Sequence, residues 1–384
     1  MTKSPARLLI FGAACLAILI GFLYFGLWPF DFSPENRAVW RPDGKGLFLD
    51  GSRTSGKRSV GSIAFIGPLK GPARIPPEEA CAFTLAIRLQ PEFEAKKALD
   101  QILNIVDSSG KNVLSLRQWK KTLIIRWRNS DAKSGRKWTE FGVGQVLIKS
   151  RPRWLTIESG NSETVVSIDG TQAIRRAGPL PPAKAGGLRH SRIIFGNSPE
   201  TGSPWTGTIF AFAIYEKSIT AKDFLDKWDN APDDRDGLLA AFNLEEKTGE
   251  RGRDLSGNGN SLDVPLHIKA QPRILGWSDY SVRTSASIIN DIAVNIIGFI
   301  PFGFFFAGML AAGERRSAWV NGALTILTGI SISLLIEIIQ GFIPARDSDL
   351  ADVLCNSAGS VVGTTGYYLF SIVEMKLRTK SQRS

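Results

Sequence analysis

The sequence predicts a mixed fold, in which a four-helix transmembrane bundle is joined to an antiparallel β-sandwich of the jelly-roll type. Long apolar runs with few charges lie towards both ends of the chain, and each is long enough to cross a hydrocarbon core. The long middle section instead consists of short β-type runs separated by Gly, Pro, Asn and Asp. The mean hydropathy of -0.02 averages these two unlike regions.

Residues 8–28 are the first predicted transmembrane helix. The basic residues Lys3 and Arg7 precede this apolar run, a pattern that also fits a cleaved signal peptide. The length of the run and the lack of a small-x-small cleavage site favour a retained span. Tyr24 and Trp28 suit the interfacial aromatic belt at its end.

Residues 35–276 are predicted to form the extracytoplasmic β-sandwich. Apolar and polar residues alternate in short runs at 81–89, 101–110, 113–119, 122–128, 153–159, 163–170, 191–197 and 206–220. Short alternating runs with turn residues between them indicate antiparallel strands. Parallel strands would need helical crossovers, and only one short helix is expected, after Thr220.

Residues 286–375 are predicted to hold three further transmembrane helices, at about 288–312, 317–343 and 350–373. Pro301 lies inside the first of these, where a membrane helix tolerates a kink. Basic residues precede the 8–28 helix, stand at Arg315 and Arg316, and follow residue 375. The positive-inside rule therefore predicts that both termini are cytoplasmic and that the β-sandwich is extracytoplasmic.

Polar residues interrupt or border the apolar runs of this region, although an ionisable group at membrane depth costs several kcal/mol unless it is partnered. The predicted topology brings them to a similar depth in the outer leaflet, where we expect carboxylates to pair with Arg346 in a polar pocket beneath the sandwich. Gly359 and Gly363 share a helix face with three of them and would allow close helix packing. The candidate site residues are Asp291, Asn295, Glu337, Gln340, Arg346, Asp349, Asp352 and Asn356.

These spaced residues resemble the signature of the VanZ-like family of bacterial membrane proteins. The resemblance rests on Glu337-x-x-Gln340 followed by Arg346-x-x-Asp349-x-x-Asp352-x-x-x-Asn356-x-x-Gly359, on Asn295-x-x-Gly298-Phe-Ile-Pro-Phe-Gly303, and on Trp28-Pro29-Phe30. It implies a multi-pass protein of the bacterial cytoplasmic (inner) membrane with a role in the cell envelope. Some members of the family are linked to glycopeptide antibiotic resistance. The middle section stands where that family commonly has a shorter connection.

Two segments of the middle section resemble laminin G-like, or concanavalin A-like, lectin domains. They are Phe195-Gly-Asn-Ser with 205–215, and 238–244 with 254–260. Such folds often bind glycans, sometimes with Ca²⁺. Asp254, Asn258 and Asn260 are better explained as a tight turn, because Gly257 and Gly259 supply positive φ at little cost.

The composition limits the classes of partner that the protein is expected to bind. The net charge of +11 comes from Lys and Arg scattered over the β-type runs, without the clustered pattern of nucleic-acid binding, so no nucleic-acid partner is expected. Membrane lipids or acidic polymers are the expected use of this charge. The three cysteines give neither a disulfide framework nor metal-ligand spacing, so no metal and no cofactor are predicted.

Three functions fit the polar residues. They could hold the helices together, as polar groups do in membrane proteins. They could bind or handle a cell-envelope glycan or a lipid-linked cell-wall precursor, which is the preferred interpretation. They could also serve a membrane hydrolase or transferase that uses clustered carboxylates, with or without a divalent metal. The two histidines, His190 and His267, lie in the β section, so no histidine base is expected among the polar residues of the transmembrane region.

Overall fold

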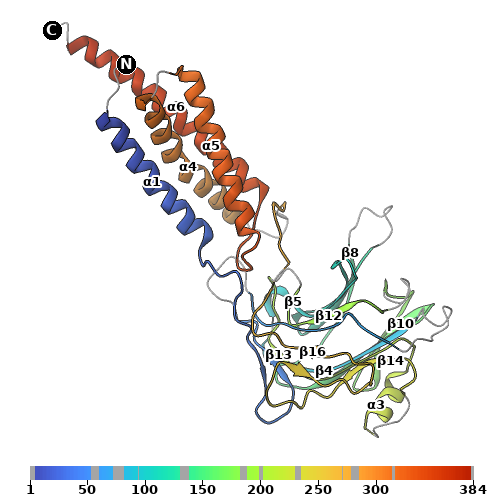
Figure 1. The fold of residues 1–384 in the computed structure, drawn as a ribbon. Helices are drawn as coiled ribbons and strands as arrows, with labels where there is room; N and C mark the ends of the chain where they lie inside the picture. The colour runs from blue at the N-terminus through green and yellow to red at the C-terminus, as the bar shows by residue number, and fades with distance from the viewer. Residues whose placement is uncertain are drawn as a thin grey trace. The chain divides into compact units, whose positions relative to one another are not determined.

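The computed structural model describes residues 5–52, 60–71, 82–93, 95–129, 138–181, 188–198, 202–229, 235–269, 271–277, 285–313 and 316–381. The chain divides into two compact units, which we describe separately. One comprises Met1–Phe32 and Gln271–Ser384, and the other Ser33–Ala270. The first is helical and the second is built of strands (Figure 1).

The helical unit is a bundle whose helices run side by side (Figure 1). Its helices are α1 (Pro5–Leu27), α4 (Ser285–Gly313), α5 (Ala318–Gln340) and α6 (Leu350–Ser381). Ser317 caps α5, because its hydroxyl accepts a hydrogen bond from Val320 N at 3.3 Å. Pro301 lies within α4, as predicted, without ending the helix.

Three helices of the described chain, not the four predicted, are long and apolar enough to cross a membrane: α1, residues 288–313 of α4, and α5. The correction concerns α6. Its buried face consists largely of small and polar residues, among them Asn356, Gly359, Ser360, Gly363 and Thr364. Such residues serve packing between helices rather than contact with lipid, and they lower the hydropathy of the whole segment.

The backbones of α4 and α6 approach each other closely. A Cβ added at Gly359 would collide with the carbonyl oxygen of Ile296, and one at Gly363 would collide with that of Ile300. Both carbonyls belong to α4, so the predicted packing role of the two glycines is confirmed. Helices in membranes associate through such close contacts, because lipid gives them no hydrophobic reason to do so.

Aromatic and ionic contacts attach α1 to the rest of the bundle. The rings of Phe22 and Phe299 stack with their centroids 4.2 Å apart, and Phe11 meets Tyr367 edge-on at 6.0 Å. At one end of the unit, Arg7 Nη1 donates to Glu374 Oε2 at 3.1 Å. The start of α1 therefore lies against the last part of α6.

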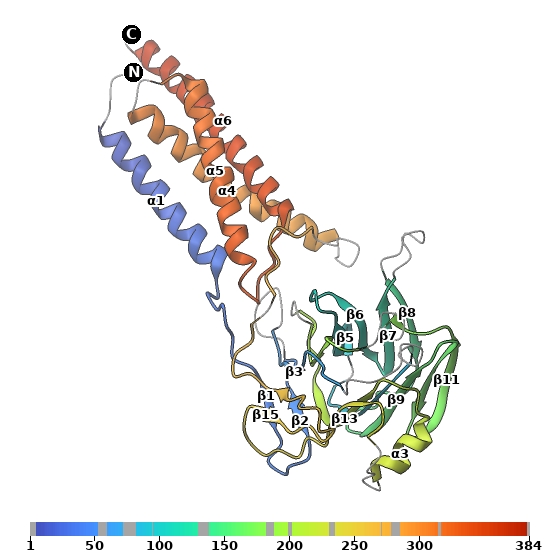
Figure 2. The ribbon, with the colours of Figure 1, turned by 45° about the vertical axis from the view of Figure 1, so that its right-hand side comes forward.

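Two antiparallel sheets form the second unit (Figure 2). The first has the order β1 (Ala38–Trp40), β2 (Leu47–Leu49), β13 (Gly207–Tyr215), β4 (Phe83–Pro91), β9 (Arg153–Ser159), β10 (Glu163–Ile168) and β11 (Thr171–Ala177), with β14 (Leu238–Phe242) also paired to β13. The second has the order β15 (Arg251–Gly252), β16 (Leu262–Asp263), β3 (Ala64–Ile66), β12 (Arg192–Phe195), β5 (Ala95–Val106), β6 (Asn112–Lys120), β7 (Thr122–Arg128) and β8 (Trp138–Val143).

One apolar core lies between the two sheets. Leu85, Ile87 and Leu89 of β4 are buried in it, and the rings of Phe195 and Phe212, one from each sheet, meet edge-on at 5.1 Å. The eight predicted runs all contain strands, namely β4, β5, β6, β7, β9, β10, β12 and β13, although residue 81 lies outside the described residues. The prediction of an antiparallel β-sandwich is therefore confirmed.

The predicted short helix is α3 (Ala221–Asp229). The Thr220 hydroxyl accepts from Asp223 N at 3.2 Å and so caps its first turn. Its Phe224 and Trp228 rings pack on Trp154, with centroids 5.1 and 5.2 Å away. Trp154 is therefore a packing residue and not an open sugar-stacking surface.

The segment from Asp254 to Asn260 is a tight turn, as preferred from the sequence. Asp254 Oδ2 accepts from Asn260 N at 2.9 Å, and Asn258 Nδ2 donates to the carbonyls of Leu238 and Leu239. Gly257 and Gly259 have φ of 82° and 71°. The polar side chains that could have suggested a calcium loop thus bond to the protein itself.

We expect Gly363→Ala to destabilise the helical unit, because the new methyl group would force α6 away from Ile300. Overpacking of this kind costs roughly 1–3 kcal/mol. Gly366→Ala is the matched control on the same helix, since its Cβ would lie 3.9 Å from the nearest atom, in Phe304. Unfolding of the full-length protein in detergent measures both. Equal stability of the two variants would contradict the close packing of α4 and α6.

Candidate functional site

A polar stripe runs along the buried side of α5. Asn321, Thr325, Gly329, Ser333 and Glu337 are all buried and recur at every fourth position. Residues with this spacing lie on one face of a helix. The stripe ends at Glu337, one turn before the loop that leads to α6.

Glu337 and Asp349 hold this loop in place. Glu337 is 3% exposed, and its Oε2 accepts a hydrogen bond from Asp349 N at 2.8 Å. The Asp349 carboxylate in turn accepts from Ala351 N at 3.0 Å and caps the first turn of α6. A carboxylate at a helix N-terminus is stabilised by the helix dipole.

Amide side chains connect α6 to its two neighbours at the same level. Asn295 Nδ2 of α4 donates to Asp352 Oδ1 at 2.6 Å. One turn later in α6, Asn356 Nδ2 donates to Ser333 Oγ of α5 at 2.9 Å. Asp291 precedes Asn295 by one turn of α4 and is half-buried. The polar residues of three helices therefore meet near one end of the bundle.

Gln340 and Arg346 extend the group to the end of α1. Gln340 Nε2 donates to Gly26 O at 2.8 Å, and Arg346 Nη2 lies 3.5 Å from Phe25 O. Burial lowers the pKa of the Arg346 guanidinium, while the negative charges of Glu337, Asp352 and Asp347 oppose that shift.

We call this group of eight predicted residues the polar cluster. Its contacts connect Asn295 with Asp352 and Glu337 with Asp349, and they attach Asn356, Gln340 and Arg346 to neighbouring elements. Asp291 continues it along α4. What the cluster does stays a prediction.

Sequence reasoning missed two serines that belong to the same region. Ser333 accepts from Asn356, and its four-residue spacing from Glu337 was a signal that could have found it. Ser348 Oγ accepts from Leu275 N at 2.9 Å, and Ser348 O accepts from Gly276 N at 2.9 Å. The segment before α4 thus lines the loop between α5 and α6, which no local pattern in the sequence indicates.

Two buried polar atoms of the cluster have no hydrogen-bond partner among the described residues. They are Nε of Arg346 and Oδ1 of Asn356. One is a donor and the other an acceptor. Buried polar atoms are nearly always paired in folded proteins, so each unpaired atom calls for an explanation.

The described ranges contain no group of three or more His, Cys, Asp or Glu residues that could hold a metal ion. His190 and His267 are exposed residues of the sandwich. Cys15 and Cys355 of the helical unit are free thiols.

The sandwich carries an open groove of about 500 Å³ along β1 and β2. Phe93 at its edge is 63% exposed. Aromatic and charged side chains line it together: Val39, Trp40, Arg41, Pro42, Phe48, Glu92 and Phe93. We call it the sandwich groove.

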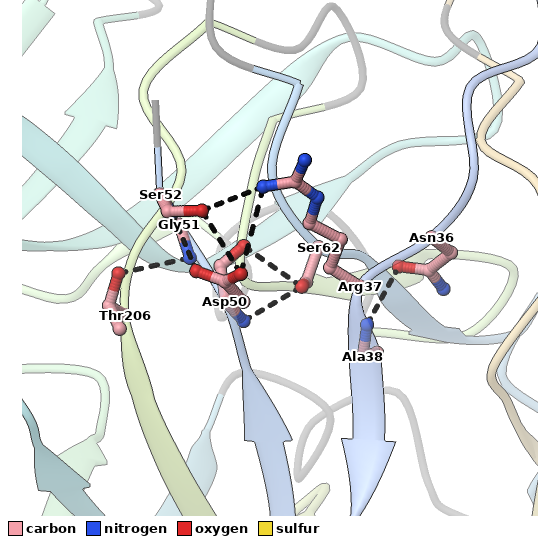
Figure 3. A network of polar contacts seen from close by, with 8 residues as sticks. All are labelled: Asn36, Arg37, Ala38, Asp50, Gly51, Ser52, Ser62 and Thr206. Carbon is pink, nitrogen blue, oxygen red and sulfur yellow. Dashed lines mark hydrogen bonds and ion pairs between the residues drawn. The ribbon is translucent and has the colours of Figure 1, made fainter. Parts of the chain in front are cut away.

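A polar network lies where β2 ends (Figure 3). Arg37 Nη1 donates to Ser52 Oγ at 2.7 Å, and Ser52 N donates to Asp50 Oδ1 at 2.8 Å. Thr206 links the network to the groove, since its carbonyl accepts from Glu92 N at 3.2 Å. These bonds fix the backbone at one end of the groove.

Three tryptophans of the sandwich have different surroundings. Trp127 is 8% exposed and belongs to the core, with Arg176 over its ring. Arg126 lies over the ring of Trp138 at 5.1 Å from the centroid. Trp119 is 45% exposed. None of the three lines the sandwich groove.

The solved structures that resemble part of this chain have low TM-scores. A candidate carbohydrate-binding protein from Bacteroides ovatus is 14% identical with a TM-score of 0.38, over 58% of this chain and 59% of that one. Tailspike protein 2 of an Escherichia coli O157:H7 bacteriophage is 14% identical with a TM-score of 0.38, over 56% and 29%. The binding domain of Botulinum neurotoxin DC, in complex with rat synaptotagmin II, is 12% identical with a TM-score of 0.36, over 52% and 47%.

The chain therefore covers less than two thirds of each of these three proteins, and no functional inference rests on them. A search of curated protein sequences finds no match. A scan against family models does find one, described as VanZ/LLP1, over residues 246–371. That stretch includes the whole polar cluster. Residues 246–371 are thus similar to the VanZ/LLP1 family, and the chain also contains an antiparallel β-sandwich.

Proposed function

We propose that the polar cluster binds the polar head group of a membrane lipid or of a lipid-linked envelope precursor. The observation that carries the proposal is the pair of buried, unpaired atoms, Arg346 Nε and Asn356 Oδ1, inside a group drawn from three helices and a loop. A head group would bring its own donors and acceptors to that depth. The half-buried Asp352 and Arg346 leave the cluster partly open.

A purely structural role accounts for the cluster less well. Polar residues that only hold helices together gain by pairing completely, because lipid offers no replacement partners. A half-satisfied buried network is less stable than an apolar core. Asn295, Asp352 and Glu337 have protein partners, yet Asn356 and Arg346 keep an unused atom each.

We also propose that α6 is a fourth crossing and that the sandwich is extracytoplasmic, on the bacterial inner membrane. α6 packs along α4 through Gly359 and Gly363, so it shares the direction of a helix that is apolar enough to span. The contact of Arg7 with Glu374 brings the basic start of α1 next to the basic end of α6, and the positive-inside rule requires both to lie on the cytoplasmic side. Lys3 and Arg315, which support the same orientation, lie outside the described residues. The glycopeptide link implied by the resemblance stays a prediction.

The sandwich groove is our proposed contact for an envelope glycan. Phe93 is 63% exposed although Lys149 Nζ lies 5.8 Å from its ring centroid, so its ring offers a surface for the apolar face of a sugar. Arg41 and Glu92 offer hydrogen bonds to hydroxyl groups beside it. The polar network at the end of β2 holds the groove in shape. The likeness to laminin G-like lectins adds no further detail to this proposal.

Removing Arg346 should release bound lipid. Loss of a charge-assisted hydrogen bond lowers affinity by about tenfold or more, so Arg346→Gln purified in detergent should retain correspondingly less lipid in mass spectrometry. Arg316→Gln is the matched control, because Arg316 is an exposed residue just before α5, at the other end of that helix. Equal lipid on both variants, at equal thermal stability, would contradict binding at the polar cluster.

Orientation can be read from cysteine labelling. Asn161 is exposed in the turn between β9 and β10, so Asn161→Cys, in a protein lacking its own cysteines, should react with an impermeant maleimide on intact spheroplasts. Lys380→Cys near the end of α6 should react only after permeabilisation. Labelling of Lys380→Cys alone on intact spheroplasts would reverse the proposed topology.

Truncating the aromatic edge of the sandwich groove should weaken glycan binding. Stacking on an aromatic ring contributes roughly 1 kcal/mol, so Phe93→Ala should bind cell-wall polysaccharide about fivefold more weakly on a glycan array. Leu255→Ala removes an exposed apolar side chain that does not line the groove, and it should bind like the parent. Full-length protein that binds no polysaccharide, or binds equally after Phe93→Ala, would remove the groove from consideration.

A further inference from the structure

We infer that the polar cluster recognises a primary ammonium and an anionic group carried by the same molecule, which is the chemistry of a phosphoethanolamine head group. The inference rests on the proposed function and names the ligand class of that site. It follows from which polar atoms of the cluster already have hydrogen-bond partners, which have none, and how many negative and positive charges the cluster contains.

The acceptor side of the site is Asn356. This residue is 7% exposed, and its Nδ2 is committed to Ser333 Oγ at 2.9 Å. Its Oδ1 is unpaired in the described part of the chain. Only an N–H or O–H donor can satisfy that atom. Because Asn356 follows Asp352 by one turn of α6, it shares a face with a carboxylate that would attract a positively charged donor.

The donor side of the site is Arg346. Its Nε is buried and unpaired among the described residues, and Nη2 is 3.5 Å from a carbonyl oxygen, that of Phe25. A guanidinium presents Nε and its neighbouring nitrogen as a planar fork that matches phosphate or carboxylate oxygens. A ligand that uses this fork in full would therefore carry an anionic group as well as a donor.

The charges of the cluster residues themselves disfavour a simple anion. The polar cluster contains four carboxylates, Asp291, Glu337, Asp349 and Asp352, and one guanidinium. A purely anionic head group would bring further negative charge towards these carboxylates, at a cost that low polarity increases. A zwitterion adds no net charge and places its ammonium among the carboxylates. A primary ammonium fits better than a quaternary one, because choline has no N–H to donate to Asn356.

The experiment compares three lipids with identical acyl chains on the full-length protein in detergent, by titration in native mass spectrometry. Phosphatidylethanolamine should bind about tenfold more tightly than phosphatidylcholine, which lacks the N–H donor, and than phosphatidylglycerol, which lacks the ammonium. Soluble O-phosphoethanolamine forms a separate arm. If it binds while the lipid does not, the ammonium and phosphate chemistry is supported and its source is a soluble molecule.

Two variants separate the two halves of the site. Asn356→Ala should bring the ratio of ethanolamine to choline lipid binding close to one, whereas Arg346→Gln should weaken both lipids alike. Asn321→Ala is the matched control, because Asn321 is a buried asparagine of α5 whose Oδ1 is also unpaired but lies four turns from Glu337. It should leave the ratio unchanged.

The failures are distinguishable. If the parent protein binds the three lipids equally, or prefers phosphatidylglycerol, the inference of a zwitterionic ligand is wrong. The proposed function still stands in that case if lipid binding depends on Arg346. Lipid binding that does not depend on Arg346 overturns both. The lipid comparison on the parent protein needs no variant, so a variant that fails to fold does not weaken the test.

Discussion

The close approach of α4 and α6 is the constraint on which the polar cluster depends. Asn and Asp have short side chains, so the 2.6 Å bond between Asn295 and Asp352 forms only if the two backbones nearly touch. Glycine makes that possible at residues 359 and 363, where a Cβ would collide with α4 carbonyls. The close packing at Gly359 and Gly363 thus lets Asn295 reach Asp352, which lies about two turns before Gly359 in α6.

The same constraint explains why α6 is less apolar than α1, α4 and α5. A helix surrounded by lipid needs apolar side chains on every face, whereas one packed between neighbours can carry Gly, Ser, Thr and Asn. The hydroxyls of Ser360 and Thr364 bond to carbonyls one turn back in α6, so they bring no unpaired donor into the interface. The low hydropathy of α6 therefore results from its packing against the other helices of the bundle.

Much of this arrangement could be predicted from the sequence. The elements and residues that were not predicted were missed for physical reasons. Helical spacing related Asp349, Asp352 and Asn356, and alternation found the central strands. Strand β11 escaped because it is an exposed edge strand whose residues carry little apolar pattern. Ser348 escaped because a loop serine gives no sign of being a hydrogen-bond partner until the fold brings a donor to it, and Ser333 was signalled only by its helical spacing from Glu337.

Buried carboxylates contribute little to stability, because the loss of hydration offsets most of the attraction to a partner. In the cluster, Glu337 accepts a backbone N–H and Asp349 caps a helix, so these two reduce the cost of their own burial. Arg346 and Asn356 gain no such compensation at Nε and Oδ1. Stability alone gives no reason for these two unpaired atoms, which is why the proposal assigns them a ligand.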